Sequence, residues 1–393
     1  MPGKNFKGEI MAMPHESQVL RTFENGLLEI SSRIVPLSSD GLDVMSTSAL
    51  AVASREVAKG DDAAADYTWT SRLVAVISDG SAVLGLGDLG PRAVLPVLEA
   101  KCAHLKATAG INAIPLVFSD RRIESIADAL AALRPSFGAV SIEDVSSPRC
   151  FALEQLLQQR LDCPVMHNDQ HGTAVAVAAA LRNAAAVLGR DFASLRVVVV
   201  GAGAAGISTA CLLVKSGIAD VTVVDTRGVV HSERTDLNKP KREISLRTNP
   251  RKIVGSLADA LVGAEVIIGL SSGRIAMEMI SLMSSDPIIF SLANPDPEIG
   301  PEVGRSLAAI YGSGRSDEKN WITNLLAVPG IFKGMLSARA RRMTDAMLLS
   351  AVDGIVRATG ECLSPNRIVP SALDPDTCRI VSAHVALAAG CGR

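Results

Sequence analysis

The chain has 393 residues and a formal net charge of −2, with 48% hydrophobic, 20% charged and only 3% aromatic residues. This length suggests two domains, or one large domain with an insertion, and the composition indicates globular cores packed with Ala, Val, Leu and Ile. The charge balance gives no reason to expect binding to nucleic acid or to an anionic membrane, and the most apolar run, 174–188, is too short and Ala-rich to span a bilayer.

Seven cysteines are scattered singly along the chain, with no CxxC pair among them. This usage predicts free thiols in a reducing compartment. The N-terminus, MPGKNFKGEIMAMPHES, lacks the apolar stretch of a signal peptide. We therefore expect a cytoplasmic protein.

The first half of the chain reads as alternating strands and helices after a mixed N-terminal region. Strands are expected at 26–34, 73–78, 114–118 and 139–142, and helices at 42–58, 93–106 and 123–133. This alternation predicts a parallel sheet. We place a linker between two domains near residues 150–165.

The alternation restarts after the expected linker. Strands are expected at 164–166, 197–200, 221–225, 266–270 and 288–292, with helices at 173–188 and from the glycine turn to Lys215, and the last sixty residues look helical. The fold class is therefore α/β with two domains, 1–162 and 163–393, the second being a doubly wound, Rossmann-type parallel sheet.

A glycine fingerprint, Gly201-Ala-Gly203-Ala-Ala-Gly206, follows the buried strand RVVVV and opens an apolar helix. Gly201 permits the turn, Gly203 lets a pyrophosphate approach the backbone, and Gly206 lets helix and strand pack closely. The helix N-terminus, with Ala204 and Ala205, would receive the phosphate charge. The predicted ligand is a nicotinamide dinucleotide.

Asp225 ends the next strand, nineteen residues after Gly206. A carboxylate there would bond the adenosine ribose hydroxyls, which favours NAD over NADP. Arg227 nearby softens that preference, so NADP stays open. A second G-x-G-x-x-G match at 85–90 lacks an acidic strand end and is interpreted as a tight turn packed against the sheet.

Three carboxylates lie where strands are expected to end. Glu143 and Asp144 follow one strand, and Asp169 precedes the helix at Thr173. Together they form a candidate site for Mg²⁺ or Mn²⁺, the alternative being solvated loop carboxylates. Adjacent strand residues point in opposite directions, so Glu143 and Asp144 can act together only if the chain bends there.

The order of several long segments resembles that of the small bacterial malic enzymes. The segments are SDGSAVLGLGDLGP, EAKCAHLKATAGINAIPL, SIEDVSSPRC, PVMHNDQHGTAVAV, VVVVGAGAAGIS, SLANPDPEI and GRSDEKNWITNLLAVPGIFKG. The resemblance runs through most of the chain from about residue 26 onward. It implies a cytoplasmic enzyme that oxidises and decarboxylates malate or another 2-hydroxy acid with NAD(P)⁺ and a divalent cation, and a homodimer or higher oligomer in which N-terminal residues complete the partner's site.

The resemblance also implies roles for particular residues. Glu143, Asp144 and Asp169 would hold the metal, and Lys101 would take the proton of the C2 hydroxyl, which requires a depressed pKa. Asn294 and Asn324 would contact substrate, Asn294 the nicotinamide as well, and Thr173 the cofactor.

Two positions depart from the family's pattern. An ungapped alignment places Ser46 where the family has the tyrosine that protonates C3 of enolpyruvate, and a serine hydroxyl has a higher pKa and a shorter reach than a phenol. Asn168 stands where the family usually has an aspartate that tunes the lysine. It keeps a hydrogen-bonding oxygen but removes a charge.

Three functions remain open on this evidence. The first is a metal- and NAD-dependent oxidative decarboxylase of malate or of a malate substituted at C3, where Ser46 frees space. The second is a decarboxylase of a 2-oxo acid without net redox change. The third is a catalytically impaired paralogue that serves as a binding or regulatory protein.

Overall fold

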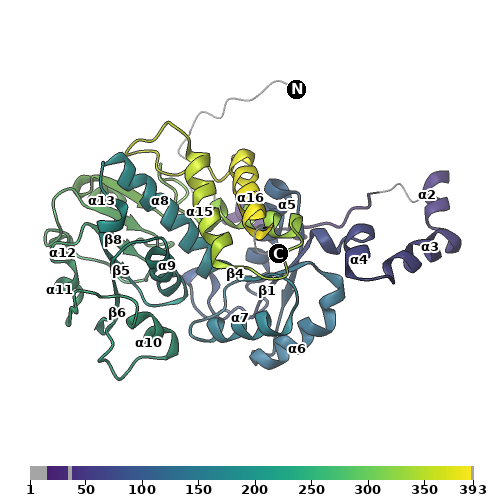
Figure 1. Ribbon diagram of the computed structural model, residues 1–393, viewed down its shortest axis with the longest axis horizontal. Helices are drawn as coiled ribbons and strands as arrows, with labels where there is room; N and C mark the ends of the chain where they lie inside the picture. Colours follow the sequence, from purple (N-terminus) through teal and green to yellow (C-terminus); the bar gives the residue numbers. More distant parts are fainter. Residues whose placement is uncertain (1–15, 34–37, 391–393) are drawn as a thin grey trace.

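The computed structural model describes residues 16–33 and 38–390. Most of them form two α/β units, called the first and second layers below, which are joined by C-terminal helices (Figure 1). The first layer holds a fully parallel four-stranded sheet in the order β2-β1-β3-β4. Its strands are β1 (Leu73–Ser78), β2 (Asn112–Val117), β3 (Ala139–Ile142) and β4 (Val165–His167), and its helices are α5 (Leu95–Ala109), α6 (Ile123–Leu133) and α7 (Arg149–Arg160).

Alternating residues of β1 determine which helices cover which face of this sheet. Val74 and Val76 join a core that includes Leu98 of α5, whereas Leu73, Ala75 and Ile77 join a core that includes buried residues of α6 and α7. Because neighbouring strand residues point to opposite faces, α5 covers one face and α6 and α7 the other.

The second layer is a six-stranded sheet in the order β10-β9-β8-β5-β6-β7, parallel except for β7. The strands are β5 (Arg196–Val200), β6 (Asp220–Asp225), β7 (Gly228–Val229), β8 (Val266–Gly269), β9 (Ile288–Ser291) and β10 (Ile310–Ser313). The helices are α8 (Thr173–Val187), α9 (Ala204–Lys215), α10 (Lys239–Ser245), α11 (Leu257–Leu261), α12 (Met277–Ile280) and α13 (Pro301–Leu307). The strand order reverses at β5, whose neighbours are β6 and β8, and such a switch point opens a crevice at the carboxyl ends of the strands.

The C-terminal helices α14 (Val328–Ser337), α15 (Asp345–Thr359) and α16 (Pro375–Gly390) tie the two layers together. Their buried residues share one continuous hydrophobic core with α5 of the first layer and α8 and α9 of the second. One hydrophobic core therefore fixes the two layers relative to each other.

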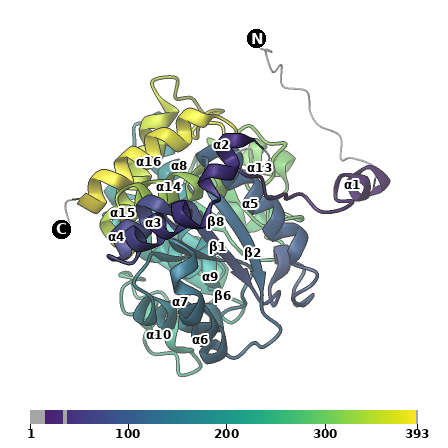
Figure 2. The same ribbon diagram turned by 90° about the vertical axis from the view of Figure 1, so that its right-hand side faces the viewer.

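The N-terminal segment projects from this body, with α2 (Ser39–Val44) and α3 (Thr47–Val57) forming an arm and α1 (Glu16–Thr22) standing apart on another side (Figures 1 and 2). α4 (Asp61–Tyr67) connects the arm to the body, where its Asp62 and Asp66 pair with Arg339. α3 and α4 bury no residue. Several large apolar side chains of the arm are more than half exposed, among them Leu42, Met45, Leu50 and Val52.

Most elements expected from the sequence are present within one or two residues of their predicted bounds, including the strand–turn–helix at 196–215. The strand expected at 26–34 is wrong for its described part, because residues 26–33 have no neighbouring strand to pair with; Ile34 lies outside the described residues. The single helix expected at 42–58 is instead two helices. α2 ends at Val44, and α3 begins at Thr47 with Ser46 as its N-cap.

The linker expected near 150–165 is also wrong. Residues 149–160 form α7, whose Cys150, Leu153 and Leu157 recur at helical spacing and are buried under the first sheet. β4, after this helix, pairs with β3 in the first sheet, so it lies beyond the predicted domain boundary at 162. No helix in the described residues is long and apolar enough to cross a membrane.

Candidate active site

The glycine turn after β5 gives two of its three glycines a steric reason, and leaves the third open. Gly201 has a φ of +114°, and a Cβ there would lie 2.4 Å from the carbonyl oxygen of Leu270. A Cβ at Gly206 would lie 1.8 Å from the Gly201 oxygen, so strand and helix could not pack as closely with any other residue. A Cβ at Gly203 would meet nothing within 4 Å, which leaves its backbone open to a ligand. Ala204 and Ala205 follow at the half-buried N-terminus of α9.

Asp225 ends β6 beside this turn, but its carboxylate already has partners. One oxygen accepts hydrogen bonds from Arg234 Nη1 (2.8 Å) and the Arg227 backbone (2.9 Å), and the other accepts from Arg234 Nη2 (3.2 Å) and Lys241 Nζ (2.6 Å). Burial raises the pKa of Asp225, but the bonds from Arg234 and Lys241 outweigh it and leave the pKa below its usual value. With its side chain 5% exposed, Asp225 has no free oxygen for a ribose hydroxyl. Asp225, Arg234 and Lys241 are called the Asp225 cluster below.

The predicted acidic residues of the first layer meet at the carboxyl ends of β3 and β4. The backbone N–H of Asp144 donates to Asp169 Oδ2 (3.1 Å), and Asp144 Oδ1 accepts from the N–H of Leu84 (3.2 Å). Asp144 has a φ of +51°, which is uncommon outside glycine. This supplies the bend that the sequence required for Glu143 and Asp144 to act in one place. Lys101, Glu143, Asp144 and Asp169 form the carboxylate cluster.

Lys101 and Asn168 both contact Glu143, whose side chain is 2% exposed. The Lys101 ammonium pairs with Glu143 Oε2 and lies 3.7 Å from Asp169 Oδ1. Asn168 donates from Nδ2 to both Glu143 oxygens (3.0 and 2.9 Å), and Ser141 donates to Oε1 (2.7 Å). Asn168 therefore acts on Lys101 through Glu143 rather than directly.

The charged groups of this cluster shift one another's pKa values. Burial raises the pKa of Asp144, and repulsion from Asp169 adds to it, so that the pKa reaches about 7. Burial raises the pKa of Asp169 as well, but the Lys101 ammonium outweighs it and leaves the pKa below its usual value. Burial lowers the pKa of Lys101, yet Glu143, Asp169 and Asp144 together raise it above its usual range. The depressed lysine pKa that the sequence analysis required is therefore absent, because three carboxylates surround the ammonium.

The carboxylate cluster fits a hard cation at two of its three predicted ligands. Asp144 Oδ2 is buried without a hydrogen-bond partner, and Asp144 and Asp169 repel each other, so a cation between them would relieve both costs. Glu143 offers no free oxygen, since each of its oxygens accepts two hydrogen bonds. Accordingly, the described residues contain no group of three His, Cys, Asp or Glu side chains arranged to hold a metal ion.

The two predicted asparagines approach the cluster from the second layer. A Cβ added at Gly172 would lie 3.0 Å from the Asn324 Cβ and 2.5 Å from Asn168 Oδ1, so Asn324 and the turn that carries Asp169 are neighbours. Asn294 is exposed, donates to the carbonyl oxygen of Gly314 (3.0 Å) and has its own carbonyl near Gly85. Thr173 begins α8 and is half-buried.

The second glycine turn, predicted as a packing turn, lies between these groups. Leu84 on it donates to Asp144 from a positive-φ backbone (+48°), and Gly85 faces Asn294. This turn thus borders the crevice on the first layer's side.

Ser46 is not part of this cluster within one chain. It caps α3 by accepting from the Ala49 N–H (3.3 Å), and its hydroxyl lies 3.1 Å from that of Ser48. α3 belongs to the projecting arm, so Ser46 occupies a helix-capping position far out on the molecule in Figure 1.

Sequence reasoning missed Glu154, which supports the segment that carries Asp169. This buried α7 carboxylate accepts from the His167 backbone (2.8 Å) and lies 3.0 Å from His171 Nε2. Burial raises the pKa of Glu154, but His171 outweighs it and leaves the pKa below its usual value. A glutamate beside the apolar stripe Cys150–Leu153–Leu157 was the available signal, because such a residue is rarely buried without a partner.

A dinucleotide-type glycine turn after β5 and a carboxylate–lysine cluster at the ends of β3 and β4 define a two-domain α/β dehydrogenase-like protein. The family model "Malic enzyme, NAD binding domain" matches residues 170–390, and "Malic enzyme, N-terminal domain" matches 43–121. The chain belongs to the malic enzyme family.

Individual relatives agree with this assignment. The chain is 38% identical to the bifunctional malic/malolactic enzyme of Bacillus subtilis, over 96% of this chain and 93% of that one. It is 42% identical to the NADP-dependent malic enzyme of Halomonas elongata, over 77% and 72% of the two chains. The crystal structure of the NAD-dependent malic enzyme of Thermotoga maritima superposes with a TM-score of 0.89 at 39% identity, covering 95% of this chain and 99% of that one.

Proposed function

We propose that this protein is an NAD(P)-dependent oxidative decarboxylase of malate or of a malate substituted at C3. The proposal rests on the carboxylate cluster, where Asp144 keeps a buried oxygen without a partner and Lys101 pairs with the buried Glu143, together with the open glycine turn at Gly203. The family assignment supplies the reaction class. We expect the protein to operate in the cytoplasm, in line with the free thiols of the six described cysteines.

Malic-enzyme chemistry uses a nicotinamide as hydride acceptor from C2 and a divalent cation, Mg²⁺ or Mn²⁺, as the electrophile that polarises the C2 oxygen. Asp144 and Asp169 would hold the cation. Glu143, the third ligand implied by the resemblance, would have to give up a hydrogen bond from Lys101 or Asn168 to join them. The turn Gly201–Gly203 and the amides of Ala204 and Ala205 would hold the dinucleotide phosphates.

Lys101 would take the proton of the C2 hydroxyl and so prepare the loss of hydride. The carboxylates that raise its pKa are also the proposed cation ligands, so neutralising them removes the cause of the raised pKa. Glu143 positions the Lys101 amine, and Asn168 fixes the orientation of Glu143 through two hydrogen bonds. Asn324 and Asn294 would orient the substrate carboxylates, and Asn294 and Thr173 the nicotinamide side of the cofactor.

Both dinucleotides fit the proposal. Asp225 is neutralised by Arg234 and Lys241 of its own chain. It therefore neither accepts hydrogen bonds from the ribose diol of NAD nor repels the 2′-phosphate of NADP. This revises the NAD preference that Asp225 alone suggested.

We further propose that a second copy of the chain covers the arm, giving a homodimer or higher oligomer. Leu42, Met45, Leu50 and Val52 are each more than half exposed on adjacent helices, an apolar surface typical of a protein interface. Sedimentation or light scattering that returns a monomer at micromolar concentration contradicts this assignment.

The experiment for the catalytic proposal supplies NAD⁺, Mn²⁺ and malate, or malates with a methyl or larger group at C3, and follows NADH and the 2-oxo acid product together. Equal amounts of NADH and 2-oxo acid are expected from at least one substrate. Lactate, or its C3-substituted counterpart, formed without NADH would favour decarboxylation without net redox change, and no product from any substrate would favour the impaired paralogue.

A further inference from the structure

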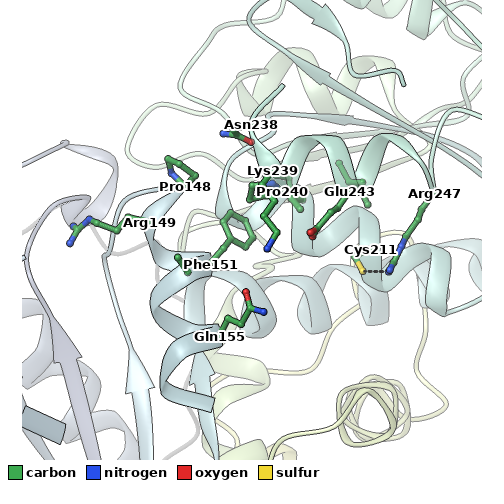
Figure 3. A pocket seen from close by; sticks show the side chains of 13 residues that line it. Pro148, Arg149, Phe151, Gln155, Cys211, Asn238, Lys239, Pro240, Glu243 and Arg247 are labelled. Atoms are coloured by element: carbon green, nitrogen blue, oxygen red, sulfur yellow. Dashed lines mark hydrogen bonds between the residues drawn. The ribbon is translucent and has the colours of Figure 1, made fainter. Parts of the chain in front are cut away.

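A cavity of about 550 Å³ lies between the two layers, bounded by α7 on one side and by α9 and α10 on the other (Figure 3). This volume falls in the range of about 300–1,000 Å³ typical of small-molecule sites. We propose that it binds a small organic anion with an apolar body, at a place separate from the dinucleotide and substrate sites. The proposal goes beyond the catalytic function and does not depend on it.

Part of the cavity wall is apolar, and its residues belong to or pack against the cores of the molecule. Ile207 of α9 and Ile244 of α10 are buried members of the second layer's core, and half-buried Phe151 of α7 packs against the cores of both layers. Pro148 and Pro240 complete the apolar surface. A rigid apolar wall of this kind favours a planar or acyl body over a fully polar ligand.

Uncompensated positive charge lies at the rim of the same cavity. Lys239 and Arg247 line it, and neither forms an ion pair within the part of the chain that the structure describes; the nearest polar partner of Arg247 is the thiol of Cys211, at 4.0 Å. Arg149 points away from the cavity in Figure 3, and it pairs with the buried Asp79. Glu243 contributes one negative charge, so the rim carries a net charge of +1 and attracts an anion.

The cavity is distinct from the two sites already described. No residue of the Gly201–Gly203 turn, the Asp225 cluster or the carboxylate cluster lines it, and its wall on α9 begins one turn further along the helix, at Ile207. An occupant would contact both layers at once, because α7 belongs to the first layer and α9 to the second. α7 also carries Glu154, which supports the Asp169 segment, and α9 begins directly after the glycine turn.

The probe for this site is 8-anilinonaphthalene-1-sulfonate, a monoanion with an apolar aromatic body, titrated into the full chain by fluorescence. One saturable site is expected, with a Kd unchanged by saturating NAD⁺. Ala152→Trp places an indole into the cavity from an exposed position of α7 and should raise the Kd at least tenfold. The matched control Gln159→Trp, exposed on the same helix but outside the cavity, should leave the Kd unchanged.

Charge is tested separately with the uncharged analogue N-phenyl-1-naphthylamine. The double variant Lys239→Ala/Arg247→Ala should weaken the sulfonate at least tenfold and the neutral analogue less than twofold, whereas Arg242→Ala, on the same helix but outside the cavity, should change neither. The proposal is overturned if no saturable site exists, if NAD⁺ displaces the probe, or if Ala152→Trp binds it as wild type does. Equal weakening of both probes overturns the anion specificity.

Discussion

Two clusters of charged side chains lie at the carboxyl ends of strands, one in each layer, and they differ in how their carboxylates are satisfied. In the Asp225 cluster, both carboxylate oxygens accept two hydrogen bonds from the chain's own donors. In the carboxylate cluster, Asp144 keeps a buried oxygen without a partner and its pKa is raised to about 7. The first arrangement stabilises a fold, and the second stores unsatisfied charge for a ligand, as functional sites commonly do.

The sharpest way to test this contrast is to remove the lysine of the unsatisfied cluster. Lys101→Met deletes the proposed base and should lower kcat by about 10²–10⁴-fold, measured as NADH formation. Lys106→Met is the matched control, because Lys106 lies on the same helix, is exposed and bonds only Asn112. A Lys101→Met enzyme within tenfold of wild type would refute the assigned role.

The Asp225 cluster should respond in stability rather than in catalysis. Asp225→Asn leaves Lys241 without its carboxylate and Arg234 with Asp236 alone, and should lower the free energy of unfolding by about 3 kcal/mol, as broken buried ion pairs do. Affinities for NAD⁺ and NADP⁺, measured by calorimetry, should stay within a few-fold of each other and of wild type. Asp353→Asn, in an exposed pair with Arg182, should cost under about 1 kcal/mol. Loss of NAD⁺ binding at unchanged stability would make Asp225 a ribose ligand after all.

Asn168 connects catalysis to packing within the carboxylate cluster. Asn168→Asp replaces a donor with an acceptor against both oxygens of Glu143 and should destabilise the fold by about 2 kcal/mol in chemical denaturation without added metal. Asn168→Ala removes the donor without adding charge and should cost less. If the aspartate variant is as stable as wild type, Glu143 does not depend on Asn168.

The smallest effect is expected at Ser46. If position 46 limits the final protonation, Ser46→Tyr should raise pyruvate formation from malate about tenfold, part of the 10²–10⁴-fold that a general acid supplies. It would also cost about 1 kcal/mol by removing a helix N-cap. Ser46→Phe has the same bulk without the hydroxyl and should not gain activity. Equal rates for both variants would show that the hydroxyl at this position is irrelevant.

The sequence predicts those features of the fold and the site that follow from local backbone rules. The glycine turn follows from its strand–turn–helix context, and the meeting of Glu143, Asp144 and Asp169 follows from parallel strands ending at one edge. What it does not predict depends on contacts between distant segments. The donors that saturate Asp225 come from a loop and a short helix up to sixteen residues away, and Glu154 reaches His171 only because α7 packs beside β4. The strand expected at 26–34 has no partner strand among the residues that the structure describes.

The most direct test of the contrast between the two clusters is the binding of Mn²⁺ to the purified protein, followed by electron paramagnetic resonance. We predict one tight site in the wild type, a Kd raised at least 100-fold in Asp144→Asn and in Asp169→Asn, and a wild-type Kd in Asp225→Asn. Unchanged Mn²⁺ binding in Asp144→Asn, or loss of binding in Asp225→Asn, would contradict the account.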